Sequence, residues 1–307
     1  MNVLLMIIIL VSTLLYAQEP ISPIPQSIPH DSAKAALGKK LFFDPILSRD
    51  YTISCASCHD FSKGGTDAQN VSTGIRQQKG SMNAPTVLNA VFNFNQFWNG
   101  RAKNLTEQAL GPIHNPVEMG LSPKEAALRL QSDAAYSHSF SKITRRSTVT
   151  PDDIAEMIAE YEKTLITPNG KFDRYLKGKA ALTPNEAKGY LLFKTLGCIS
   201  CHNGVNVGGN SYQKMGAIVP IKHSTRIDDR FALTGREQDK NVFKVPTLRN
   251  ITLTAPYFHD GSTATLEDAI TKMSYHNLGV KLTPAEIDSL IAFLNTLTGE
   301  IPAQAYP

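Results

Sequence analysis

Two pentapeptides of the chain share the pattern Cys-x-x-Cys-His: residues 55–59 read CASCH and residues 198–202 read CISCH. Two cysteines at this spacing, followed at once by histidine, form the attachment pattern of c-type haem. The thiols bond covalently to the haem, and the adjacent histidine is held beneath the iron as its proximal ligand. The sequence therefore predicts two covalently bound haem c groups, with the attachment residues Cys55, Cys58, Cys198 and Cys201 and the iron ligands His59 and His202.

Other cysteine chemistry explains these residues less well. A zinc site would place its cysteine pairs about 15–20 residues apart, whereas these pairs lie about 140 residues apart. A thioredoxin-like site would need a βαβ context. All four cysteines of the chain fall inside the two motifs, so none is left for a disulfide.

The function of each haem depends on the residue that faces the other side of its iron. An open axial position lets a haem bind and activate oxygen species, whereas a second strong ligand restricts it to electron transfer. The chain has six further histidines that are candidates for such a ligand: His30, His114, His138, His223, His259 and His276.

The composition is that of a globular protein, with 42% hydrophobic and 19% charged residues among 307. This length favours two domains, since single domains usually have ~100–200 residues. The formal net charge is only +4, and no run of Lys and Arg occurs. Nucleic acid is therefore not expected as a partner.

The first residues, MNVLLMIIILVSTLLYAQEP, contain a long apolar stretch and no charge before Glu19. The stretch is shorter than the ~20 residues that span a bilayer, and a small-residue cleavage point follows Ala17. We expect residues 1–17 to be a cleaved export signal. Because a positively charged start is missing, an uncleaved N-terminal anchor is the alternative. Either way, the folded part is expected outside the cytoplasm, in the periplasm.

Helices dominate the predicted secondary structure. Four segments begin with Ser or Thr, then Pro, then an acidic residue two places on: SPKE at 122, TPDD at 150, TPNE at 183 and TPAE at 283. This pattern caps a helix N-terminus, because the hydroxyl accepts from a free amide, Pro suits the first turn and the acid completes the cap. Apolar residues follow at helical spacing after 150 and after 283, whereas long alternating runs are absent. An all-α protein with long loops and little β-structure is therefore predicted.

The two haem motifs suggest two related units. Each motif follows a short helical segment, AALGKKLFF before the first and EAKGYLLFKTLG before the second. The pattern breaks near TPNG at 167–170. We therefore expect two c-type cytochrome domains, residues 18–172 and 173–307, each carrying one covalently bound haem.

Six stretches make the chain resemble a known family. In order, they are LGKKLFFDPILS, SCASCHD, NAPTVLNAVFN, FWNGRAKNLTEQALGPIHNPVEMG, VPTLRNITLTAPYFHDGS and MSYHNLG. Together they resemble the bacterial di-haem cytochrome c peroxidases over nearly the whole mature chain. In that family an N-terminal haem reduces hydrogen peroxide. A C-terminal haem of higher potential receives electrons from a small mono-haem cytochrome c or a cupredoxin.

The resemblance implies roles for particular residues. Glu118 in NPVEM matches the catalytic acid–base, which moves a proton between the two peroxide oxygens, and Gln108 matches the amide that assists it. Trp98, the single tryptophan, matches the residue on the electron path between the haems. Met273 matches the thioether ligand of the second iron, which raises reduction potential, and His259 matches a residue beside that haem.

The resemblance also implies a calcium ion and a partner subunit. The residues that match an inter-haem calcium site are Asn83, Thr254 and Pro256, whose oxygens suit a hard cation. Family members are usually homodimers, and the same is expected here.

One part of the chain departs from the family pattern. Many members carry a histidine between the first motif and NAPT that closes the peroxidatic iron until the second haem is reduced. Here that loop reads VSTGIRQQKGSMNAPT and offers Ile75 and Arg76 instead, and no histidine occurs between His59 and His114. We therefore expect the first haem to be five-coordinate or water-bound in the oxidised protein.

Two other functions fit parts of the pattern. Related di-haem enzymes oxidise a protein substrate to mature a quinone cofactor, and they place a tyrosine on the second iron. Tyr275 keeps this alternative open, whereas Met273 opposes it. An electron-transfer protein with two closed haems would need a strong sixth ligand at the first haem.

Overall fold

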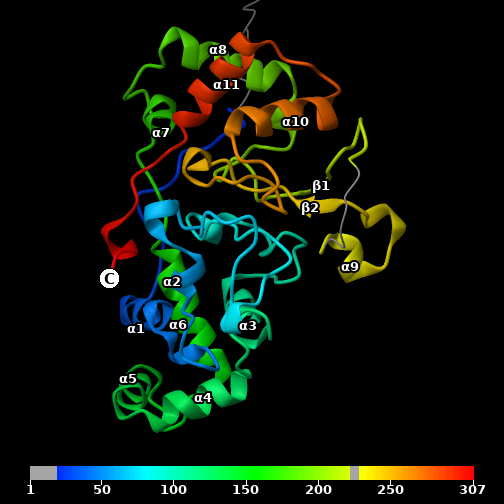
Figure 1. Ribbon diagram of the computed structural model, residues 1–307. Helices are drawn as coiled ribbons and strands as arrows, with labels where there is room; N and C mark the ends of the chain where they lie inside the picture. The colour runs from blue at the N-terminus through cyan, green and yellow to red at the C-terminus, as the bar shows by residue number, and fades with distance from the viewer. Residues whose placement is uncertain (1–18, 222–227) are drawn as a thin grey trace, which may run out of the picture.

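The computed structural model describes residues 19–221 and 228–307. The chain forms two mainly helical lobes with long loops between them (Figure 1). The predicted export signal lies outside the described residues, as does His223. Within the described part, no helix is both long and apolar enough to cross a membrane.

The helices of the first lobe are α1 (Ser32–Phe43), α2 (Cys55–Cys58), α3 (Leu105–His114), α4 (Pro123–Ser132), α5 (Ala134–Thr144) and α6 (Pro151–Lys163). The rest of the chain adds α7 (Lys171–Leu176), α8 (Pro184–Thr195), α9 (Arg230–Thr234), α10 (Leu266–Leu278) and α11 (Pro284–Asn295). A two-stranded antiparallel sheet joins β1 (Tyr212–Lys214) to β2 (Val242–Lys244). Most of the regular structure is helical and the sheet is small, as predicted.

The four predicted helix starts are confirmed as those of α4, α6, α8 and α11. Each has a reciprocal cap in which the Ser or Thr side chain accepts from the backbone and the acid three residues on accepts from the cap amide. The apolar face predicted for α6 is buried completely or almost completely, from Ile154 to Leu165. The α11 face is buried except for Ile291, which is half-buried.

Both lobes are built on a pair of crossing helices, α1 with α6 and α8 with α11. A glycine lies at each crossing. A Cβ on Gly38 would lie 1.8 Å from the Met157 carbonyl oxygen, and a Cβ on Gly189 would lie 1.8 Å from that of Ser289. Only glycine permits backbones to approach so closely. The two segments that precede the haem motifs therefore pack in the same way.

Each lobe has its own hydrophobic core, and each core includes a residue from a segment near the opposite end of the described chain. The first core contains Leu41, Phe42 and Tyr161 together with Ala305 from the C-terminal tail, and Tyr161 Oη donates to the Gln304 carbonyl at 3.0 Å. The second core contains Phe172 and Phe293 together with Ile21 from the N-terminal segment. The terminal segments thus tie each lobe to the other. The boundary at 172/173 stays a prediction.

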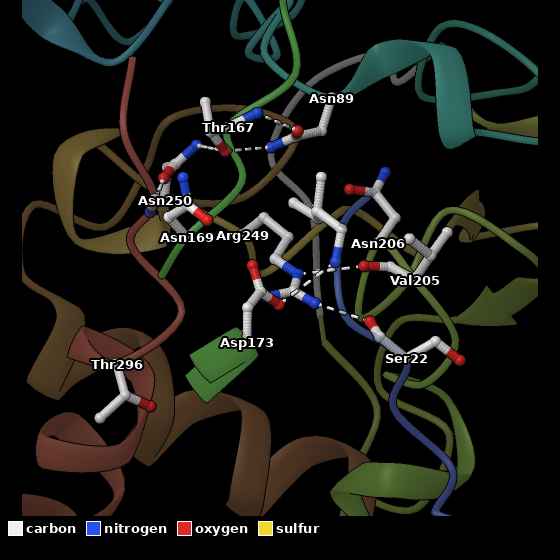
Figure 2. A network of polar contacts seen from close by, with 12 residues as sticks. Ser22, Asn89, Thr167, Asn169, Asp173, Val205, Asn206, Arg249, Asn250 and Thr296 are labelled. Atoms are coloured by element: carbon white, nitrogen blue, oxygen red, sulfur yellow. Dashed lines mark hydrogen bonds and ion pairs between the residues drawn. The ribbon is translucent and has the colours of Figure 1, made fainter. Parts of the chain in front are cut away.

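A buried polar network joins segments from both halves of the chain (Figure 2). The Arg249 guanidinium forms an ion pair with Asp173 at 2.7 Å and donates to the carbonyls of Ser22 at 2.9 Å and Val205 at 3.0 Å. Both side chains of the ion pair are at most 1% exposed. Beside it, Asn89 and Asn250 each donate to Thr167 Oγ1 at 2.8 Å.

The two asparagines belong to an internal repeat that was not recognised in the sequence. Residues 83–132 and 244–293 align without gaps, so that Asn89 corresponds to Asn250 and Ser122, the cap of α4, corresponds to Thr283, the cap of α11. Both asparagines adopt left-handed φ angles, 61° and 59°. The shared elements of this repeat place equivalent residues of the two lobes face to face.

Candidate haem sites and the interface between them

The first haem motif folds as the short helix α2, with His59 directly after it. His59 Nδ1 hydrogen-bonds to the Gly65 carbonyl at 3.1 Å, which leaves Nε2 to bind iron. Burial lowers the pKa of His59 below its ordinary value, so the ring is neutral at pH 7, the form that ligates a metal. Its ring lies 6.4 Å from that of Phe42. These features fit a haem held by Cys55 and Cys58.

The second motif shows the same arrangement. His202 Nδ1 hydrogen-bonds to the Val207 carbonyl at 3.4 Å, and burial lowers the pKa of His202 to about 4. A cavity reaches Cys198, Cys201 and His202 and is lined mostly by apolar side chains, among them Phe193, Leu196, Leu248, Ile270, Leu290 and Leu294. The apolar lining, the two thiols and the neutral imidazole fit a covalently bound haem.

Met273 lies on α10 and lines the same cavity as His202. The two neighbouring residues that compete for the role of iron ligand lie elsewhere. Tyr275 is 37% exposed, and His276 Nδ1 hydrogen-bonds to the Val219 carbonyl at 2.8 Å. The position of Met273 therefore favours the thioether as the second ligand of this haem.

Glu118 is positioned by a tight turn that follows α3. Helix α3 contains Pro112 and ends at His114, and the chain then folds back so that Met119 N donates to the Pro112 carbonyl at 3.2 Å. The amides of Glu118 and Gly120 both donate to the Asn115 carbonyl, at 3.0 and 2.9 Å. The equivalent helix α10 continues to Leu278. Only the first lobe therefore unwinds here and brings a carboxyl to its haem site.

The surroundings of Glu118 suit a group that takes up and releases protons. Asn115 Nδ2 donates to Glu118 Oε1 at 2.7 Å. Burial raises the pKa of Glu118 above its ordinary value, while the Arg101 charge and the Asn115 hydrogen bond lower it by less. Burial also raises the pKa of the Cys58 thiol to about 11, and the charge of Glu118 adds to that rise. The carboxyl therefore lies near the first haem motif, with a proton affinity shifted toward neutral pH.

Gln108 lies half-buried on α3. Its side chain forms no hydrogen bond with Glu118 or with any other described residue. Arg101 and Asn115, by contrast, interact with Glu118 but were not singled out from the sequence. The signal available was their place within FWNGRAKN and IHNPVEM, the stretches that carry the family resemblance. Both residues also line a surface pocket with His114.

The loop that lacks a histidine packs directly against the Glu118 turn. Ile75 N donates to the Glu118 carbonyl at 2.8 Å, and the Ile75 side chain is 3% exposed. A Cβ on Gly74 would lie 2.1 Å from the Val117 carbonyl oxygen, so only glycine permits this approach. Arg76 is exposed. The loop therefore presents a buried aliphatic side chain, Ile75, beside the Glu118 turn.

Trp98 and His259 occupy equivalent positions in the internal repeat and face each other across the interface. Their ring centroids lie 6.3 Å apart in an edge-to-face arrangement. The backbones pair in the same reciprocal manner, since Asn83 N donates to the His259 carbonyl at 2.8 Å and Lys244 N to the Trp98 carbonyl at 2.7 Å. Trp98 Nε1 also donates to the Asn83 carbonyl at 2.9 Å. The two rings thus form a direct contact between the lobes.

The internal repeat shows which residue of the first lobe is equivalent to Met273, the expected second ligand of the C-terminal haem. Met273 in α10 corresponds to Pro112 in α3. Proline has no side-chain donor atom for iron, so the first lobe carries no counterpart of the thioether at this position.

The residues matched to a calcium site lie in one place. Asn83, Thr254 and Pro256 all line the cavity at the interface. Asn83 Nδ2 donates to the Gln69 carbonyl at 2.8 Å, which leaves Oδ1 as an acceptor. The described residues contain no cluster of three or more His, Cys, Asp or Glu that would hold a metal ion, so any cation here would depend on amide and carbonyl oxygens.

The other described candidates for an iron ligand are four histidines. His30, His114 and His138 are exposed. His259 is buried and its ring stacks on Phe243 with centroids 4.1 Å apart.

Comparisons with known proteins give matches over most of the chain. Residues 32–181 match the family model described as di-haem cytochrome c peroxidase, and residues 186–298 match cytochrome c. The chain is 50% identical to cytochrome c551 peroxidase of Nitrosomonas europaea over 287 residues, which cover 93% of this chain and 86% of that protein. It is 43% identical to cytochrome c551 peroxidase of Pseudomonas aeruginosa over 93% of this chain and 86% of that protein.

A solved structure shows the same fold. It is described as a MauG-like protein associated with microbial copper homeostasis, and it is similar to this chain with a TM-score of 0.78 and 30% sequence identity. The alignment covers 92% of this chain and 93% of that one. The chain has two haem attachment motifs and two cytochrome-like lobes, and relatives at 43–50% identity match it over nearly its whole length. It therefore belongs to the di-haem cytochrome c peroxidase family.

Proposed function

We propose that this protein reduces hydrogen peroxide to two water molecules, consuming two protons and two electrons. Relatives at 43–50% identity are named cytochrome c551 peroxidase. The single observation that carries the proposal is the Glu118 carboxyl, which is held by Asn115 near the first haem motif and whose pKa is raised by burial. A redox protein without catalysis has no need of such a group.

Each residue near Glu118 has a distinct task. When bound, the first haem supplies the iron that binds peroxide and passes on the electrons. The Glu118 carboxylate accepts the proton from the peroxide oxygen nearest the iron and returns it to the far oxygen, which leaves as water. Asn115 orients the carboxylate through its 2.7 Å hydrogen bond. The Arg101 charge favours the ionised form of Glu118 and so opposes the effect of burial on its pKa.

A second haem held by Cys198, Cys201 and His202 would accept the electrons from the donor, and the contact between Trp98 and His259 offers them a route between the lobes. The donor is a small mono-haem cytochrome c or a cupredoxin. A higher potential at the second haem follows from ligation by His202 and Met273. The reaction takes place in the periplasm, where residues 1–17 direct the chain before they are removed.

A haem held by Cys55, Cys58 and His59 would have no second protein ligand from the 60–113 loop, so turnover would need no prior reduction to release one. Two observations support this part of the proposal: the buried Ile75 replaces the usual histidine, and Pro112 replaces the counterpart of Met273. A calcium ion bound through oxygens of Asn83, Thr254 and Pro256 stabilises the interface, and the protein acts as a homodimer.

The alternatives have less support. A protein-oxidising enzyme of the MauG type would use Tyr275 on the second iron, but Tyr275 is exposed while Met273 lines the cavity. An electron carrier would need a sixth ligand at the first haem, which the folded loop does not offer.

Glu118→Gln tests the proposal because it keeps the shape of the side chain and removes its titration. We expect peroxide turnover to be lost while both haems remain attached and the second haem keeps its spectrum. Glu267→Gln, an exposed carboxyl on α10, is the matched control and should leave turnover unchanged. Wild-type turnover should begin at once from the fully oxidised protein. Unchanged turnover in Glu118→Gln would remove the acid–base role.

A further inference from the structure

Lys244, at the end of β2, is a buried cation at the interface between the two lobes. It is 6% exposed and lines the cavity that also contains Cys198, Cys201 and His202. Its amide donates to the Trp98 carbonyl at 2.7 Å. The preceding residue, Phe243, stacks on His259. Lys244 is therefore held in place on both sides by the residues that join the two haem sites.

The ammonium group has no counter-ion among the described residues. No ion pair and no side-chain hydrogen bond joins Lys244 Nζ to any described residue. Burial alone lowers the pKa of Lys244, to about 8, with no carboxylate acting in the opposite direction. An uncompensated buried charge is strongly unfavourable. An anion inside the cavity would therefore compensate the charge of this lysine.

The internal repeat shows how unusual this lysine is. Lys244 corresponds to Asn83 of the first lobe, and the two residues make reciprocal backbone bonds to His259 and Trp98. Asn83 is also buried and satisfies its amide on the Gln69 carbonyl. At the same point the second lobe carries a positive charge in place of a neutral amide. The difference places an anion-binding group on one side of the interface only.

The haem that fits this cavity carries its own anions, because each haem c has two propionate carboxylates. We propose that Lys244 binds a propionate of the second haem and holds that edge of the haem beside Trp98. The chemistry recognised is a carboxylate in a mainly apolar cavity, where a charge-assisted hydrogen bond to an ammonium is short and strong. Lys244 is a positioning residue in this proposal, which concerns the bound haem and does not depend on peroxide turnover.

The test compares holoproteins carrying Lys244→Met, which removes the charge at similar length, and Lys244→Arg, which keeps the charge. Lys240→Met is the matched control, since Lys240 is 50% exposed and pairs with Glu237 at 2.7 Å. Two quantities are measured for each: the midpoint potential of the second haem by spectroelectrochemistry, and the propionate bending band in its resonance Raman spectrum. Covalent haem content is checked first.

In Lys244→Met, we expect a lower midpoint potential, because an uncompensated carboxylate stabilises the ferric haem, and a shifted propionate band. Lys244→Arg should keep the potential near that of the wild type and still shift the band, since the hydrogen-bond geometry changes. Lys240→Met should change neither. If Lys244→Met fails to retain haem, Lys244→Arg still tests the proposal through the Raman band.

Two results would overturn the proposal. A propionate band that is the same in the wild type and both Lys244 variants would show that no propionate contacts the amine. A wild-type potential that changes on titration with formate, with an unchanged propionate band, would show that Lys244 binds a solvent anion instead.

Discussion

A methyl group at position 74 should disturb catalysis by displacing the backbone of Glu118, with the Glu118 side chain itself left unchanged. In Gly74→Ala the new Cβ would lie 2.1 Å from the Val117 carbonyl oxygen and 2.6 Å from the Glu118 Cα. Non-bonded carbon atoms are most stable at about 3.5–4.0 Å, so the loop and the Glu118 turn must separate by at least about 1 Å. Forced overpacking of this kind costs about 1–3 kcal/mol. A displacement of that size near reacting atoms lowers the rate by about 10²-fold.

Gly80→Ala is the control within the same loop, because its Cβ would meet nothing closer than the Ser72 carbonyl oxygen at 3.6 Å. Both variants are assayed for steady-state peroxide reduction, starting from the fully oxidised protein and from protein with the second haem already reduced. We expect Gly74→Ala to lose activity in both states and Gly80→Ala to retain it, with the second haem unaffected in both. Equal activity in the two variants would refute the idea that the loop positions Glu118.

Two further predictions follow from the polar contacts. Asn115→Ala removes a hydrogen bond that favours the Glu118 carboxylate, so the pKa of Glu118 should rise further. Fewer molecules then hold the ionised base at a given pH. The acid limb of the pH–activity profile should therefore move to higher pH. An unmoved profile would show that another group controls that limb. Asp173→Asn leaves the buried Arg249 without its counter-ion and should destabilise the protein by about 3–5 kcal/mol. The measurement is the free energy of unfolding from denaturant titration. The control Lys240→Met breaks an exposed ion pair and should lower that free energy by about 0–1 kcal/mol. Similar losses of stability in the two variants would contradict the reasoning.

Much of the secondary structure was predictable because its determinants are local. The capping sequences at 122, 150, 183 and 283 were sufficient to predict where α4, α6, α8 and α11 begin, since each cap bonds within one turn. The haem motifs were equally clear, because attachment to one haem requires the two cysteines and the histidine at a fixed short spacing.

The site around Glu118 was predictable only in part. Glu118 itself was found through the family resemblance, whereas its partners Asn115 and Arg101 were missed. The Asn-Pro pair at 115–116 marks a turn, but nothing local indicates that this turn brings Met119 back to Pro112 or that Gly74 makes its close approach to Val117. The loop and the turn lie about 40 residues apart in the sequence, and their contact depends on how α3 packs in the first lobe.

The sequence by itself determined that the chain attaches two haems, that it is mainly helical and that it belongs to this family, because each conclusion rests on short motifs. Only the tertiary structure decided how the two units face each other, with Trp98 against His259 and, beside them, a Lys244 amine that no described residue pairs. The physical reason is that burial and charge compensation depend on every segment that packs around a group. A lysine in a β-strand looks ordinary in the sequence, and only its enclosure by distant segments removes the water that would otherwise solvate it.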